Sequence, residues 1–171
     1  MAELSHDLHV LVEALDRHGV RYLFVGGVAA IANGATRLTH DIDLMPERGD
    51  NLTRLAAALE ELHAQMRLRP DEPPLPVPDV ELLVRQLAGS TWTTDAGPVD
   101  VLVAMRSTDG NDVFYEDVIG EAITSFAAGI EVTAIGLDDL IAVKEATGRP
   151  KDLEALIELR AIRQRRSDDA H

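Results

Sequence analysis

Two short segments decide the fold: Phe24-Val25-Gly26-Gly27 and, thirteen residues later, Asp41-Ile42-Asp43-Leu44. The apolar run from Arg21 to Val25 ends at two glycines, which predicts a buried strand that turns directly into a helix. In the second segment aspartates alternate with apolar residues, so a strand would project both carboxylates from one face. We therefore expect a sheet with a glycine turn and a pair of acids at its edge.

The paired aspartates predict a metal site. Two carboxylates on one face repel each other and are costly to desolvate unless solvent or a cation compensates them. A hard divalent cation with oxygen ligands is the natural compensation. A third acid, Asp100, sits in the apolar run Val99–Val103 and joins the same face if its strand pairs beside residues 41–44. Three such carboxylates can hold two magnesium ions about 3.5–4 Å apart, an arrangement that serves nucleotidyl transfer.

The glycine turn predicts an anion site beside these acids. Gly26 and Gly27 let backbone N–H groups approach an anion closely at the start of the helix that follows. A tight turn without a ligand is the alternative interpretation.

Composition limits the classes of protein. The chain has 171 residues, no cysteine and a net charge of −14, with 30 acidic residues against 16 Lys and Arg. One domain covering residues 1–171 is expected, with a helical part at about 137–166. The absence of cysteine excludes disulfides, thiolate zinc sites and a Cys nucleophile. The charge argues against extended gripping of nucleic acid, DNA in particular. No apolar run or basic leader indicates a membrane span or export, so we expect a cytoplasmic protein.

Periodicity predicts an α/β (α+β) fold, in which a small mixed sheet is flanked by helices. Helices are expected at about 5–18, 28–33, 50–63, 79–87, 137–146 and 151–165. Strands are expected at about 21–25, 41–45, 91–94 and 99–103, with a second hairpin at 122–126 and 130–135. The stretch 69–78 holds five of the eight prolines and is expected to be an irregular loop.

On these residues, the chain resembles the nucleotidyltransferase superfold of DNA polymerase beta, poly(A) polymerases and aminoglycoside nucleotidyltransferases. That family has a hydrophobic residue before Gly-Gly or Gly-Ser, then Asp-x-Asp or Asp-x-Glu, and later a third acid on a strand. The resemblance implies a minimal nucleotidyltransferase fold with C-terminal helices. It also implies that Asp41, Asp43 and Asp100 bind Mg²⁺, that Asp100 helps to deprotonate an acceptor hydroxyl, and that Gly26 and Gly27 carry the triphosphate of an NTP.

A second block resembles the AbiEii-like nucleotidyltransferase toxins of bacterial toxin–antitoxin loci. It consists of Lys144 and the segment Arg149-Pro150-Lys151-Asp152. The resemblance implies that these charged residues complete the nucleotide site, with Lys144 on the phosphates. It further implies tRNA 3′ ends as acceptor and an antitoxin protein as partner. Arg37 and Thr39, which precede the aspartate pair, also match the minimal bacterial branch and are candidate nucleotide-binding residues.

Simpler interpretations exist for the flanking residues. Lys144 on an amphipathic helix could be solvated, and Asp152 in a first helical turn could serve only the helix dipole. Arg37 and Thr39 could be ordinary loop groups. The alternative acceptor is a small molecule such as an aminoglycoside, because an acidic protein suits a cationic molecule and repels tRNA except in the region Lys144–Arg166. A catalytically silent nucleotide-binding regulatory module is the remaining alternative.

Overall fold

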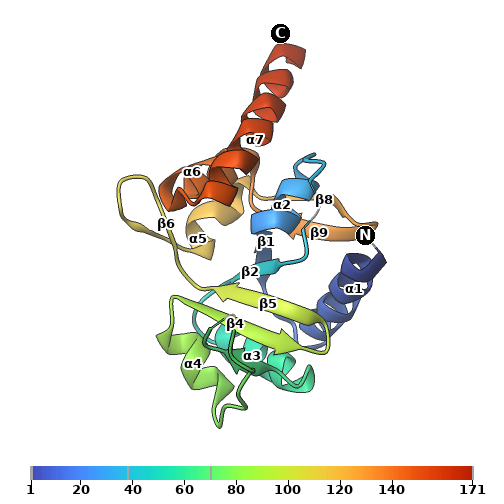
Figure 1. Cartoon of the computed structure of the whole chain (residues 1–171), viewed down its shortest axis with the longest axis vertical. Coiled ribbons are helices and arrows are strands. Elements are labelled where there is room, and N and C mark those ends of the chain that lie inside the picture. The colour runs from blue at the N-terminus through green and yellow to red at the C-terminus, as the bar shows by residue number, and fades with distance from the viewer. Residues whose placement is uncertain (1, 38, 70, 171) are drawn as a thin grey trace.

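The computed structural model describes residues 2–37, 39–69 and 71–170, and its main sheet has seven strands. The strands are β1 (Tyr22–Val25), β2 (Ile42–Pro46), β3 (Gln65–Arg67), β4 (Gly89–Thr94), β5 (Gly97–Leu102), β8 (Ile123–Ala127) and β9 (Ile130–Ala134). They lie in the order β3-β4-β5-β2-β1-β9-β8 (Figure 1). The sheet is mixed, because β2 pairs antiparallel with β1 but parallel with β5. The predicted fold class is confirmed.

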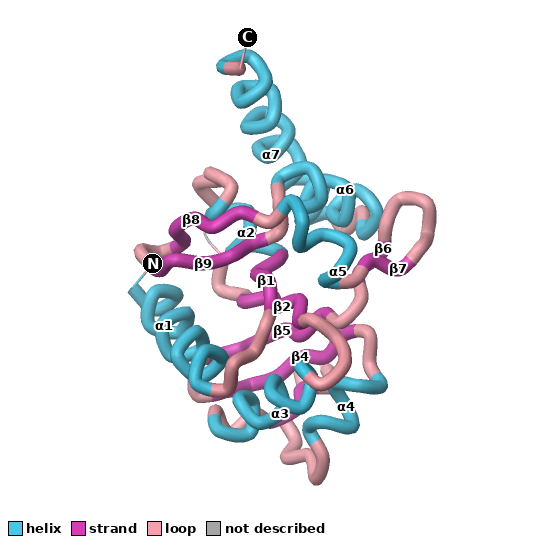
Figure 2. The backbone as a smooth tube through the Cα atoms, turned by 180° about the vertical axis from the view of Figure 1, so that it is seen from behind, coloured by secondary structure: helices cyan, strands magenta, loops and turns pink. Residues whose placement is uncertain are grey.

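Helices cover this sheet, and a small two-stranded ribbon stands apart from it (Figure 2). The helices are α1 (Ala2–Arg17), α2 (Gly26–Ala32), α3 (Asn51–Glu61), α4 (Val80–Gln86), α5 (Tyr115–Val118), α6 (Leu137–Thr147) and α7 (Pro150–Asp169), with a 3₁₀ turn, η1 (Ile119–Glu121). The ribbon is β6 (Met105–Arg106) and β7 (Asp112–Val113). In the described part of the chain, no helix is long and apolar enough to cross a membrane.

The core contains the side chains that the apolar periodicity predicts. Leu8, Leu11 and Leu15 of α1 are fully buried, as are Phe24 of β1 and Trp92 of β4. Burying a large apolar side chain stabilises the folded state by about 1.5–3 kcal/mol. The apolar side chains of the strands thus pack into the core. The polar side chains of the same strands are left to line a site.

The register of the central strands places the acids. Asp43 of β2 pairs with Asp100 of β5, and Val25 at the end of β1 pairs with Asp43 on the other side. In a parallel pair, residues in register point to the same face. The glycine turn and two of the three acids therefore meet at one place, although they come from three separate segments.

Several predicted boundaries are confirmed, with small differences. Asp79 caps α4, since its carboxylate accepts from the Leu82 N–H at 2.8 Å. Asp50 precedes α3 as expected, but its side chain makes no capping hydrogen bond. The expected break before α7 is also present: Gly148 has a φ of 62° at the end of α6, and Pro150 stands in the first turn of α7.

The structure also contains elements that the sequence analysis missed: β3, the ribbon β6–β7, and the short helix α5 with η1. In the proline-rich stretch, Pro70 lies outside the described residues, and residues 69 and 71–78 are largely irregular, as predicted. Within it, however, Leu75 exchanges two backbone hydrogen bonds with Met66 of β3, at 2.9 and 2.8 Å. This pairing covers part of the outer edge of β3, which would otherwise be an exposed strand edge.

Candidate active site

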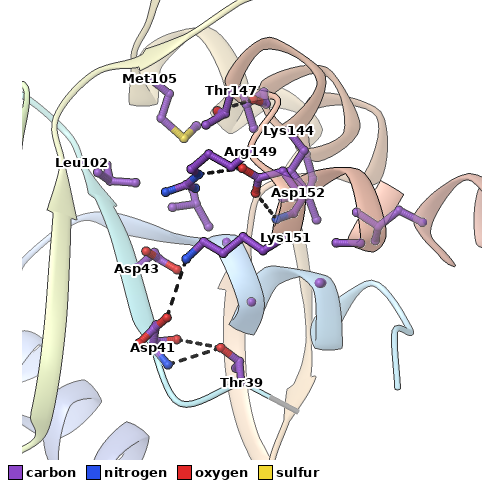
Figure 3. A pocket seen from close by; sticks show the side chains of 18 of the residues that line it. Thr39, Asp41, Asp43, Leu102, Met105, Lys144, Thr147, Arg149, Lys151 and Asp152 are labelled. Atoms are coloured by element: carbon purple, nitrogen blue, oxygen red, sulfur yellow. Dashed lines mark hydrogen bonds and ion pairs between the residues drawn. The ribbon is translucent and has the colours of Figure 1, made fainter. Parts of the chain in front are cut away.

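A cavity of about 830 Å³ opens where β1 and β5 end beside the start of β2, and α6 and the N-terminal half of α7 form its opposite wall (Figure 3). The eleven candidate residues from the sequence all line it: Gly26, Gly27, Arg37, Thr39, Asp41, Asp43, Asp100, Lys144, Arg149, Lys151 and Asp152. The fold thus gathers residues from distant stretches of the chain around one space.

The glycine turn lies in close contact with its neighbours. Gly26 has a φ of +60°, and a Cβ at this position would collide with the carboxylate of Asp43. A Cβ on Gly27 would collide with the Thr39 side chain, whose own Cβ would lie 2.6 Å away. The Gly27 N–H donates a hydrogen bond to Asp43. Gly26 is therefore specified by its conformation and by its packing against Asp43, and Gly27 by its packing against Thr39.

Asp43 is the acid most strongly affected by its surroundings. Burial, together with the carboxylates of Asp100 and Asp41, raises its pKa from 3.8 to about 6. Lys151 and the Gly27 N–H act in the opposite direction. A half-buried carboxylate beside two others is unfavourable unless a cation compensates its charge, and such perturbed acids cluster at functional sites.

Asp41 is held differently from the other two acids. Its side chain is 65% exposed, and its Oδ2 lies 3.9 Å from the Nζ of Lys151, which reaches across the cavity from α7 (Figure 3). The Thr39 hydroxyl donates to the backbone carbonyl of Asp41 at 3.2 Å. This small turn fixes the backbone of Asp41 while leaving its carboxylate free to change partner.

The donor set suits a hard divalent cation, because it consists of carboxylate oxygens that cost free energy when left uncompensated. The ligands are not assembled in advance. Among the described residues, no group of three or more His, Asp or Glu side chains is close enough to hold a metal ion. Asp43 and Asp100 are in register, whereas Asp41 is engaged by Lys151. Binding of Mg²⁺ by all three acids therefore requires Asp41 to exchange Lys151 for the metal.

A buried acid organises the cationic wall of the cavity. Asp152 is only 3% exposed; its Oδ1 accepts from Lys144 Nζ at 3.2 Å and its Oδ2 from Arg149 Nε at 2.7 Å. Although burial raises its pKa, the hydrogen bonds from Arg149 and Lys144 hold that pKa below its usual value. Because both oxygens of Asp152 are occupied, this carboxylate positions two cations rather than facing the cavity alone.

Arg37 lines the cavity but also pairs with Glu154 of α7 at 3.1 Å, in an exposed ion pair. Sequence reasoning missed Glu158 and an apolar part of the lining, which consists of Leu102, Ala104, Met105, Leu140 and Val143. Leu102 could have been identified, because it lies two residues after Asp100 in the same strand and so shares its face. The others come from elements whose packing no local pattern specified.

Comparison with known proteins finds similarity in structure but not in sequence. No protein-family model and no curated protein matches the chain. The antibiotic-resistance factor ANT(2'')-Ia is 20% identical with a TM-score of 0.59, over 97% of this chain and 92% of its own. The lincosamide antibiotic adenylyltransferase LnuA is 11% identical with a TM-score of 0.60, over 91% and 96%. A nucleotidyltransferase-like protein from Thermotoga maritima is 16% identical with a TM-score of 0.55, over 87% and 89%. The chain therefore has the fold of these nucleotidyltransferases.

Proposed function

We propose that this protein is a magnesium-dependent nucleotidyltransferase that moves a nucleoside monophosphate from an NTP to an acceptor hydroxyl and releases pyrophosphate. The observation that carries the proposal is the register of Asp43 and Asp100 beside the Gly26-Gly27 turn, with a cationic wall opposite. The fold shared with known nucleotidyltransferases supports it.

Each wall of the cavity has a task in this reaction. Asp41, Asp43 and Asp100 would hold two magnesium ions, which neutralise the charge that develops on the phosphates during transfer. The backbone of the glycine turn would receive the triphosphate. Lys144 and Arg149, oriented by Asp152, would draw the triphosphate toward α6 and α7, and pyrophosphate would leave from this side.

The transfer itself is one displacement at phosphorus. The acceptor oxygen forms a bond to the α-phosphorus, and the bond from that phosphorus to the bridging oxygen of the pyrophosphate breaks. Asp100 takes the proton of the acceptor hydroxyl. Arg37, Thr39 and Lys151 also line the cavity, and we assign them to holding the nucleotide once Lys151 has released Asp41.

We propose a small molecule as the acceptor. The net charge of −14 favours a cationic acceptor and disfavours a polyanion. Of the four arginines at positions 160–166 that could form a basic surface, three are engaged: Arg160 pairs with Glu145, Arg163 with Asp138, and Arg166 donates to the Asn33 carbonyl. The structurally similar proteins include ANT(2'') in complex with adenylyl-2''-tobramycin and LnuA bound to lincomycin. An aminoglycoside-like cationic molecule is therefore the first candidate.

The tRNA 3′ end, with an antitoxin as partner, is the second candidate. It is favoured by Lys144, Arg149 and Lys151, which are among the cations that line the same cavity, and by the likeness of these residues to the AbiEii-like toxins. A catalytically silent nucleotide-binding module is the third possibility. Any transfer of label from an NTP to an acceptor would exclude it.

Label transfer tests the proposal. Purified protein is incubated with Mg²⁺, each of the four labelled NTPs, and either a panel of aminoglycosides and lincosamides or total tRNA. We expect transfer to one acceptor class, its loss in Asp43→Asn and Asp100→Asn, and no change in Asp95→Asn, whose exposed carboxylate lies in the β4–β5 turn. Folded protein that transfers no label with any NTP and either acceptor class contradicts the proposal, and NTP binding without turnover supports the regulatory module.

A further inference from the structure

One face of α7 contacts the segment between α2 and β2 along its length. We call residues 33–41 the connector and Lys151, Glu154, Glu158 and Arg166 the α7 stripe. The contacts are Lys151 to Asp41 at 3.9 Å, Glu154 to Arg37 at 3.1 Å, Glu158 to Thr36 at 2.8 Å, and Arg166 to the Asn33 carbonyl at 2.8 Å. The stripe positions are spaced by three, four and eight residues, which keeps them on one side of a helix with 3.6 residues per turn.

The connector carries two site residues and has little structure of its own. In the described residues between Asn33 and Asp41 there is no helix or strand. It nevertheless delivers the Asp41 carboxylate to the cavity and places the Thr39 side chain directly against Gly27. Whatever fixes the connector therefore also fixes Asp41 and the contact with the glycine turn.

Glu158 makes the strongest of the stripe contacts. Its Oε1 accepts both the Thr36 backbone N–H and the Thr36 hydroxyl, each at 2.8 Å. These hydrogen bonds hold the pKa of Glu158 below its usual value. By contrast, the Arg37–Glu154 pair is exposed on both sides, and pairs of this kind contribute little. The connector is thus held mainly at Thr36.

The start of the connector is anchored from two directions. Asn33 is fully buried, and its side-chain amide donates to the carbonyls of Ala29 and Ile135 at 2.9 and 3.0 Å. Arg166 donates to the Asn33 backbone carbonyl, at the C-terminal end of α2. A cation at this end of a helix is favourable. Asn33 therefore fixes where the connector begins, and Glu158 fixes the direction in which it continues.

Helix α7 has its own buried side chains, which hold it in place beside the stripe. Asp152, Leu156, Leu159 and Ile162 are all buried, on a side of the helix that adjoins the stripe. Glu154 and Glu158 lie toward the other edge of the stripe, and their contacts in this structure are to the connector. This arrangement favours a positioning role for these two residues over a general contribution to the stability of the helix.

We propose that the α7 stripe, and Glu158 above all, positions the connector so that Asp41 can join Asp43 and Asp100 around a divalent cation. Glu158 is a positioning residue, because it acts on the site through Thr36. The kinetic part of this inference rests on the proposed function, whereas the positioning of the connector and the binding of metal do not.

The test compares Glu158→Ala with Glu158→Gln, which keeps an oxygen that accepts from Thr36. Arg160→Ala is the matched control. Arg160 lies on α7, as Glu158 does, but it pairs with Glu145 of α6 and does not contact the connector. Hydrogen exchange of the full-length protein and binding of Mn²⁺ alone are measured first, then kcat and the Mg²⁺ concentration that gives half-maximal activity.

In Glu158→Ala we expect faster exchange of the Thr36 amide and about five- to tenfold weaker Mn²⁺ binding, the effect of losing one or two hydrogen bonds to a charged acceptor. The Mg²⁺ requirement should rise in parallel with little change in KM for the NTP. Glu158→Gln should stay within about twofold of wild type, and Arg160→Ala should match wild type.

The proposal is overturned if Glu158→Ala shows the hydrogen exchange and the Mn²⁺ affinity of the wild type. It is also overturned if Arg160→Ala loses as much Mn²⁺ affinity as Glu158→Ala does. If Glu158→Ala does not fold, Thr36→Val removes one of the two bonds from the connector side, and the same readouts decide. If exchange and Mn²⁺ binding change as expected but the wild-type protein shows no transferase activity, the positioning role stands and the proposed function fails.

Discussion

Replacing Asp43 by asparagine is expected to stabilise the metal-free protein at neutral pH while abolishing its activity. Asparagine keeps an oxygen that accepts from the Gly27 N–H, and it removes the charge that burial and the Asp100 and Asp41 carboxylates oppose. A residue that is unfavourable for folding yet required for chemistry is typical of active sites.

The magnitude follows from the pKa of Asp43. It rises from 3.8 to about 6, and one pKa unit corresponds to about 1.4 kcal/mol. The native state holds the Asp43 proton more tightly than the unfolded chain does, so the free energy of unfolding falls as the pH rises from about 4 to about 6. Near pH 7.5 the penalty is at most about 3 kcal/mol, and we expect about 1–2 kcal/mol because the site is partly solvated.

Urea unfolding of wild type and Asp43→Asn in EDTA, at a series of pH values, measures this difference. The advantage of the variant should be largest above about pH 6 and shrink toward about pH 4. Added Mg²⁺ should stabilise wild type more than the variant, since it compensates the charge that the variant lacks. A variant that is less stable than wild type, or a difference independent of pH, would refute the electrostatic account of this site.

Three further substitutions test the geometry around the site and beside it. Gly26→Ala should cost about 1–2 kcal/mol from its positive φ, and it should abolish label transfer because the new methyl displaces Asp43; retained activity would contradict the close packing of the turn. Asp152→Ala leaves the ammonium group of Lys144, whose side chain is 12% exposed, without its carboxylate partner. The free energy of unfolding, measured by chemical denaturation, should fall by about 3 kcal/mol. Asp152→Asn should lose less of this free energy. Asn51→Ala removes three hydrogen bonds to the backbone of Arg21 and Glu47. It should lower the melting temperature by roughly 4–8 °C with unchanged kcat. An altered kcat would show that the contacts of Asn51 influence the cavity.

The site could be predicted from the sequence because its key residues break local rules. Asp43 lies between two apolar residues in a buried strand and has no ordinary structural explanation. Asp100 lies in a similar apolar run, where an acid paired with an arginine at a strand start is the simpler interpretation. Two glycines after a strand are equally distinctive. These are positions where local propensity conflicts with the surroundings, and such conflicts are expected at functional sites.

Other features carried no local signal. The short strand β3 exists because it pairs with β4, and helix α5 spans only Tyr115–Val118, too short for a periodic pattern. Glu158 looks like any charged residue on the exposed face of a helix until Thr36 is placed beside it. Contacts between residues this far apart in the chain depend on tertiary packing, which hydrophobic periodicity does not specify.

The pairing of Asp43 with Asp100 has a practical consequence for protein engineering. The chain leaves the site at Asp43 and returns at Asp100, and of the described residues between them none lines the cavity. This excursion includes the proline-rich stretch beyond β3, at the sheet edge opposite β8. A fluorescent reporter or affinity tag inserted near Pro73-Pro74 should leave the metal-binding groups undisturbed, because closing a longer surface loop costs little free energy. The half of the molecule that contains the cavity can thus be followed in cells through a segment whose described residues do not line it.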